Sequence, residues 1–118
     1  MFDFEKDYAN AIFKVTIQIG DLLGKPKEDV YVTLCEPDTF DSLLMNSVQK
    51  TKAEEIVKYF DGIFDKILVD HNFMRNGEKV SNEEVHKFLF KKVNVIERII
   101  AQYLKEVFIS PQTKTNEK

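Results

Sequence analysis

The stretch Val30–Val48, VYVTLCEPDTFDSLLMNSV, changes its hydrophobic period at Pro37. Before Pro37 the apolar residues alternate, as they do in a half-buried β-strand. After it they recur every three or four residues, as on one face of an amphipathic helix. Proline lacks a donor N–H, which ends strand pairing but is tolerated in the first turn of a helix. This stretch therefore predicts a strand that runs directly into a helix.

A second alternating stretch, IFKVTIQI, precedes the first at residues 12–19. The segment between the two, GDLLGKPKED at residues 20–29, contains two glycines and one proline, which is typical of a turn or a wide loop. We therefore expect an antiparallel hairpin. A hairpin alone is marginally stable in water, so its apolar face should be covered by helices.

Helical patterns fill the rest of the chain. The first, TKAEEIVKYFDGIFDKILVDHNF, covers residues 51–73 and opens with a capping box, Thr51 followed three residues later by Glu. Gly62 lies in the middle of this pattern, where it either lets a neighbour pack closely or is merely tolerated. The next segment, MRNGEK at residues 74–79, predicts a turn because Asn-Gly readily adopts positive φ.

The last helical pattern begins at Ser81, which forms a second capping box, and keeps one apolar stripe as far as Phe108. That spacing permits one long helix. However, Asn94 followed by Glu97 forms a third capping box, which favours two helices with a bend near Lys92.

These elements predict one α+β domain, in which an N-terminal two-stranded antiparallel β-hairpin packs against a bundle of three to four amphipathic helices. The chain has 118 residues, of which 43% are hydrophobic and 31% charged, which suits a single globular domain. We assign residues 1–110 to this domain and expect residues 111–118 to be a polar, disordered tail.

The charge and the cysteine count exclude several classes of function. Seventeen Lys and Arg against twenty Asp and Glu give a net charge of −3, and the basic residues are dispersed, so we expect no nucleic-acid partner. The single cysteine, Cys35, cannot form an internal disulfide. The N-terminus is acidic and polar, and no stretch is apolar enough to cross a bilayer. We therefore expect a cytoplasmic protein without a membrane partner.

No catalytic or metal-binding motif is recognisable. His71 and His86 are the only histidines, and acidic residues at 65, 70, 83 and 84 are near them in sequence, but no metal-ligand spacing is present. Cys35 has no basic neighbour that would lower its pKa, so it is expected to be a half-buried structural thiol. We expect no catalytic residues, no cofactor and no metal.

Binding through apolar surface remains. The last helical pattern has an apolar face wider than one hairpin would cover, and surplus apolar surface often marks a partner site. In KFLFKK at residues 87–92, Phe88 and Leu89 lie on the core stripe, whereas Phe90 projects away from it. The residues that we expect to contact a partner are Phe90, Ile99, Tyr103, Val107 and Phe108.

The order of these elements resembles that of the tail assembly chaperones of long-tailed bacteriophages and prophages. The resemblance covers roughly residues 13–109 and is carried by the strand-to-helix step VTLCEPDTFDSLL (32–44) and by the closing segment KVNVIERIIAQYLKEVFIS (92–110). It implies a protein that is not an enzyme and that binds the tape measure protein, and also tail tube subunits, to keep them assembly-competent. It also implies helix-in-groove docking and self-association.

Two other functions are compatible with the same elements. One is a protein-interaction adaptor or structural subunit encoded by a mobile element. The other is a DNA-binding regulator that uses residues 81–93 and 94–108 as a helix-turn-helix-like pair. The second requires five basic side chains to share one exposed face: Lys87, Lys91, Lys92, Arg98 and Lys105.

Overall fold

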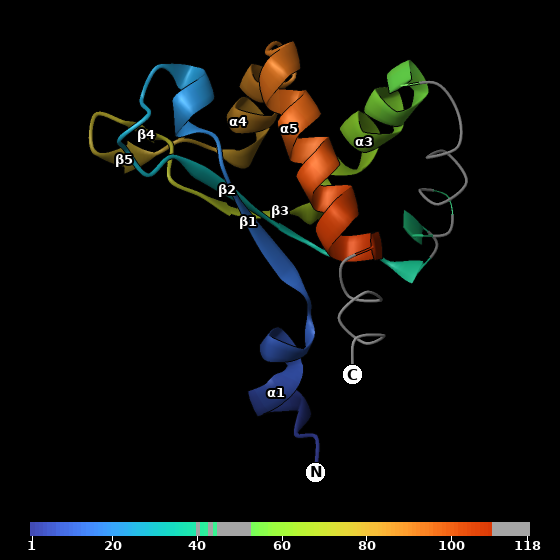
Figure 1. Ribbon diagram of the computed structural model, residues 1–118. Helices are drawn as coiled ribbons and strands as arrows, with labels where there is room; N and C mark the ends of the chain where they lie inside the picture. The colour runs from blue at the N-terminus through green and yellow to red at the C-terminus, as the bar shows by residue number, and fades with distance from the viewer. Residues whose placement is uncertain (40, 43, 45–52, 110–118) are drawn as a thin grey trace.

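A computed structural model describes residues 1–39, 41–42, 44 and 53–109 of the chain (Figure 1). It contains both helices and strands, which confirms the α+β class. The start of the helix expected after Pro37 is confirmed, because residues 39, 41, 42 and 44 are helical and Asp38 Oδ1 accepts a hydrogen bond from the Asp41 N–H at 2.8 Å. The rest of that helix and the cap at Thr51 fall on residues 40, 43 and 45–52, outside the described part. The tail at 111–118 also lies outside it, so the division at residue 110 stays a prediction.

The predicted hairpin is confirmed. Strands β1 (Lys14–Gln18) and β2 (Tyr31–Cys35) pair antiparallel, from Lys14 opposite Cys35 to Gln18 opposite Tyr31. The alternation in the sequence has the expected effect, because Val15, Ile17 and Ile19 are buried. The connection contains a short 3₁₀ helix, η1 (Gly20–Leu23).

A third strand corrects the prediction of a two-stranded sheet. Helix α3 (Ala53–Ile67) ends before the expected helical pattern does, and β3 (Leu68–His71) pairs antiparallel with β2, giving the order β1-β2-β3. The register shifts by one residue there and leaves Val69 without a ladder partner. A short apolar run such as ILV fits either period, so sequence pattern alone did not separate strand from helix.

Three helices cover one face of the sheet (Figure 1). They are α3, α4 (Asn82–Leu89) and α5 (Val93–Leu104), and a π-helical turn, η2 (Lys105–Ile109), continues α5. The bend expected near Lys92 is confirmed. Its cause is different from the one expected, because α5 is capped by Lys92 and makes no side-chain cap hydrogen bond, so the third capping box is not used.

Between β3 and α4 lies a short hairpin of β4 (Met74–Arg75) and β5 (Glu78–Lys79), as the Asn-Gly turn predicted. Both turn residues, Asn76 and Gly77, have positive φ, 52° and 83°. Ser81 then caps α4, since its Oγ accepts a hydrogen bond from the Glu84 N–H at 3.2 Å.

An N-terminal helix, α1 (Phe4–Ala11), was not expected from the sequence. The carboxylate of Asp3 caps it by accepting hydrogen bonds from the N–H groups of Glu5 and Lys6, at 3.0 and 3.2 Å. In return the Asp3 N–H donates to Asp7 Oδ2 at 2.7 Å. Helix α1 projects from the N-terminal end of β1, away from the helical layer (Figure 1). None of the described helices is long and apolar enough to cross a membrane.

Candidate functional site

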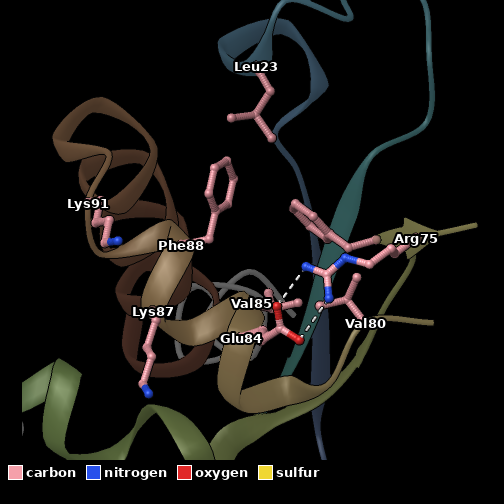
Figure 2. A pocket seen from close by; sticks show the side chains of 9 residues that line it. Leu23, Arg75, Val80, Glu84, Val85, Lys87, Phe88 and Lys91 are labelled. Atoms are coloured by element: carbon pink, nitrogen blue, oxygen red, sulfur yellow. Dashed lines mark hydrogen bonds and ion pairs between the residues drawn. The ribbon is translucent and has the colours of Figure 1, made fainter. Parts of the chain in front are cut away.

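An open pocket of about 470 Å³ lies where η1, the β4–β5 hairpin and α4 meet. We call it the Phe88 pocket, after the ring at its centre. Figure 2 shows Phe88 with Leu23 of η1 on one side and Arg75 of β4 on the other. The volume is within the range of about 300–1,000 Å³ that is usual for ligand pockets. The pocket is lined by Leu23, Phe73, Arg75, Val80, Glu84, Val85, Lys87, Phe88 and Lys91.

The pocket's apolar part is built on α4. Val85 and Leu89, one turn apart, are both buried in the core and fix the orientation of the helix. Phe88 is therefore turned toward the hairpin, and its side chain is 39% exposed. Phe73 meets it edge to face, with ring centroids 6.0 Å apart, which is a favourable aromatic geometry. The result is an aromatic surface held on a rigid helix.

An ion pair closes one wall of the pocket. Arg75 donates two hydrogen bonds to the Glu84 carboxylate, at 3.1 and 2.7 Å, and so joins β4 to α4 (Figure 2). These hydrogen bonds, with the charge of Arg75, hold the pKa of Glu84 below its usual value and raise the pKa of Arg75. Both side chains are exposed, so the pair positions the wall more than it stabilises the fold.

The rim of the pocket is basic. Lys87 lies on α4, Lys91 follows it in the turn, and Lys92 Nζ is 5.8 Å from the centroid of the Phe88 ring, within cation–π range. In the described part of the chain, no carboxylate forms an ion pair with any of these three lysines. A chain with a net charge of −3 thus has a locally cationic rim around an aromatic surface.

The structure reverses the expectation for the two phenylalanines of KFLFKK. Phe88 is exposed in the pocket, whereas Phe90 packs inward, with ring centroids 5.2 Å from Phe64 and 4.9 Å from His86. The reason is that α4 ends at Leu89, so Phe90 is already in the turn and no longer follows the helical period. The bend that the sequence predicts near Lys92 already indicated that Phe90 need not follow the helical period.

The other residues expected to contact a partner lie on α5 and η2. Ile99 and Tyr103 are fully buried, and the Tyr103 hydroxyl donates a hydrogen bond to the Cys35 carbonyl at 2.8 Å. These two side chains therefore form core rather than surface, because β1, α3 and α4 all pack against α5, and the centroid of the Tyr103 ring lies 5.4 Å from that of Phe60 on α3. Val107 packs partly against the core. The side chain of Phe108 lies outside those that the structure describes.

The two histidines and the cysteine lie in separate places and do not form one site. His86 lies between two carboxylates of α3, with Nε2 2.5 Å from Asp61 and Nδ1 2.8 Å from Asp65. His71 is buried on β3. Cys35 is half-buried, and burial raises the pKa of its thiol, in agreement with a structural role. Within the described ranges, no group of three His, Cys, Asp or Glu residues is arranged to hold a metal ion.

The helix-turn-helix alternative required Arg98 on an exposed basic face. Instead, its guanidinium donates two hydrogen bonds to Asp21, at 2.6 and 2.9 Å, and a third to the Gln18 carbonyl at 3.3 Å. Arg98 therefore ties α5 to η1 and β1, and its charge is largely compensated. This interaction takes one of the five cations away from the face that DNA would need.

Comparison of the chain with protein-family models, with curated protein sequences and with solved structures finds no match. The class of protein is therefore inferred from the fold and from the Phe88 pocket.

Proposed function

We propose that this protein is a non-enzymatic chaperone that binds a segment of another polypeptide in the Phe88 pocket. The observation that supports this most directly is the combination of an exposed aromatic surface with a cationic rim. An exposed ring such as Phe88 gains free energy when a partner covers it, and the neighbouring lysines favour a partner of opposite charge.

The pocket favours a partner segment of defined chemistry. Its apolar part accepts one or two large apolar or aromatic side chains, and its rim favours carboxylates on either side of them. An amphipathic helix with such side chains one turn apart meets both requirements, which is the helix-in-groove mode of recognition. Because α4 is anchored by buried Val85 and Leu89, the pocket is pre-organised and little entropy is lost on binding.

As the particular function we propose a phage tail assembly chaperone, in keeping with the resemblance of the element order. Its partner would be the tape measure protein, and also tail tube subunits, in the cytoplasm of the host cell. A long helical tape measure chain exposes apolar stripes before the tube forms around it, and such stripes aggregate when they are left uncovered. A small domain with one pocket for an acidic, apolar helix could cover them reversibly.

Co-expression with a tape measure fragment encoded by the same genome tests this proposal. We expect the wild-type protein to keep the fragment in the soluble fraction. The double charge reversal K87E/K91E should weaken binding by about tenfold, because both positions then repel an acidic partner. Both lysines are exposed, so the variant should fold normally.

The matched control is K27E/K58E, which makes the same change of charge at two exposed positions that do not line the pocket. It should bind as the wild type does. If the fragment sediments in the presence of the wild-type protein, or if both double variants lose it equally, the proposed function is wrong.

A further inference from the structure

We infer that the N-terminal segment of one copy of this chain, residues 1–11, docks in the Phe88 pocket of a second copy. The inference rests on the proposed function only in using the same pocket. It assigns that pocket an occupant when no other partner is bound.

The segment of residues 1–11 exposes apolar surface, and none of its residues belongs to the described core or packs against it. Phe2 is 57% exposed, Phe4 68% and Tyr8 50%. Phe4 and Tyr8 are one turn apart, and their ring centroids are 4.8 Å from each other, so the two rings form one continuous patch. Aromatic side chains bury on the order of 150–250 Å² each when they are covered, so the docking of this patch would contribute strongly to binding.

The length of α1 supports the same conclusion. It has eight residues, and isolated helices shorter than about 12–15 residues are marginal in water. The reciprocal hydrogen bonds between Asp3 and Asp7 favour the helical form but do not replace tertiary contacts. A short capped helix with an exposed aromatic face is typical of a segment that becomes stable on binding.

The charges of the two surfaces are complementary. Helix α1 begins with a capping Asp3 and has two more acidic residues, Glu5 and Asp7, in its first turn. The rim of the pocket has Lys87 and Lys91, neither of which forms an ion pair with a carboxylate among the described residues. Docking of the Phe4 and Tyr8 rings against Phe88 would bring these carboxylates to the lysines, which is the pattern expected of a specific contact.

The contact is expected between two copies rather than within one. Helix α1 is joined by two residues to Lys14, at the end of β1 that pairs with Cys35. The pocket is beyond the opposite end, since Leu23, which lines it, is the last residue of η1, and η1 follows Gln18 in the chain. The five residues of β1 span roughly 16 Å, and α1 points away from them (Figure 1). To reach the pocket of its own chain, α1 would have to fold back along the whole of β1. The pocket of a second copy can accept α1 without this change of direction.

Because α1 and the pocket are different surfaces, each copy has one of each. Copies can therefore join head to tail into a ring or filament, or exchange their helices in a symmetric dimer. A client helix with the same chemistry would compete with α1, so self-association would keep the pocket covered until a client is present.

Complementation between two variants of the full chain tests the inference. F4S/Y8S removes the aromatic patch and keeps the pocket, whereas K87E/K91E keeps α1 and alters the rim. We expect the wild type to self-associate in analytical ultracentrifugation, and each variant alone to do so at least about tenfold more weakly. A mixture of the two variants should form one-to-one complexes, because one good helix and one good pocket remain.

A single-tryptophan reporter gives a second, independent measurement. The chain contains no Trp, so F4W places the only indole on α1. Its emission should shift to shorter wavelength as the protein concentration rises, and the shift should disappear when K87E/K91E is added to the same chain. Emission that is already shifted and does not depend on concentration would indicate docking within one chain, and would overturn the inference.

The remaining outcomes also decide the matter. A wild-type chain that stays monomeric at high concentration contradicts the inference, and so does self-association that neither variant weakens or that the mixture does not restore. The proposed function is judged separately, because F4S/Y8S should still keep the tape measure fragment in solution. If the fragment sediments with every variant while complementation succeeds, the proposed function fails and the self-association stands.

Discussion

Single residues of this protein gain their roles from what surrounds them, and His71 shows this clearly. Its ring is 1% exposed, and Nδ1 accepts a hydrogen bond from the Phe73 N–H at 3.0 Å. Nε2 makes no hydrogen bond in the described part of the chain. Burial disfavours the charged ring and lowers the pKa of His71. Protonation of Nδ1 would also break the bond to Phe73, so the folded protein favours the neutral ring.

His71 should therefore make the fold sensitive to mild acid. Its folded pKa is below the ordinary 6.5, so in this window the unfolded chain binds more protons than the folded one. The contribution of neutral His71 to the free energy of unfolding is fully present above about pH 6.5 and is lost as the pH falls toward the folded pKa. We expect the free energy of unfolding, measured in urea at pH 7.5 and 5.5, to fall on acidification in the wild type.

The variant H71Q should lose most of this pH dependence, even though it is less stable overall. His86 is present in both proteins, so any contribution from that ring cancels in the comparison. Equal pH slopes in the two proteins would show that His71 is not the group responsible.

At the scale of the element, the glycines of η1 and α3 have opposite environments: one has no room for a side chain and the other has ample room. Gly20 begins η1 and is buried, and a Cβ there would come within 2.7 Å of the carbonyl oxygens of Lys25 and Glu28. Gly62 lies on the exposed side of α3, and a Cβ there would meet no atom within 4 Å. Of the two explanations left open by the sequence, the structure supports the merely tolerated glycine at Gly62.

The same substitution at the two positions should therefore have opposite effects. We expect G62A to stabilise the protein by about 0.5–1 kcal/mol, because alanine loses less backbone entropy in a helix. G20A should destabilise it by about 1–3 kcal/mol, since the loop carbonyls must move apart. Urea unfolding of the two variants measures both values, and shifts of the same sign would contradict this account of the loop.

At the scale of the whole molecule, the sheet and its helical cover form one core, whereas α1 has no part in it. The core joins all three strands of the sheet, β1, β2 and β3, with α3, α4 and α5. Strand β2 lies in the centre of the sheet, with β1 and β3 on its two sides. The residues of α1 are absent from the described core and its immediate neighbours. Local stability should therefore differ sharply between β2 and α1.

Hydrogen exchange at low protein concentration should show this difference. We expect the amides of β2 to be among the slowest to exchange, near the rate of global unfolding, and those of α1 to exchange almost as fast as in an unfolded chain. Strong protection of α1 in the monomer would mean that it packs on its own domain. Protection that appears only at high concentration is the result expected from docking between copies.

How much of the fold was predictable depended on whether the signal was local. Alternation at residues 12–19 and 30–35 encodes β1 and β2, and the Asn-Gly pair encodes the β4–β5 turn, because both act through neighbours in the chain. The carboxylate of Asp3 is an equally local signal for α1. The acidic, polar composition of the N-terminus, by contrast, does not indicate a helix. The Phe88 pocket was missed because its walls come from three separate elements.

By itself, the sequence determined the α+β class, the hairpin and the break between α4 and α5, since hydrophobic period, caps and turn residues act over a few positions. Only the tertiary structure decided that residues 68–71 form a third strand, that Ile99 and Tyr103 are core, and that Phe88 rather than Phe90 is exposed. Each of these depends on which surfaces meet after the chain has folded. Burial is a property of the assembled elements, and no single segment carries it.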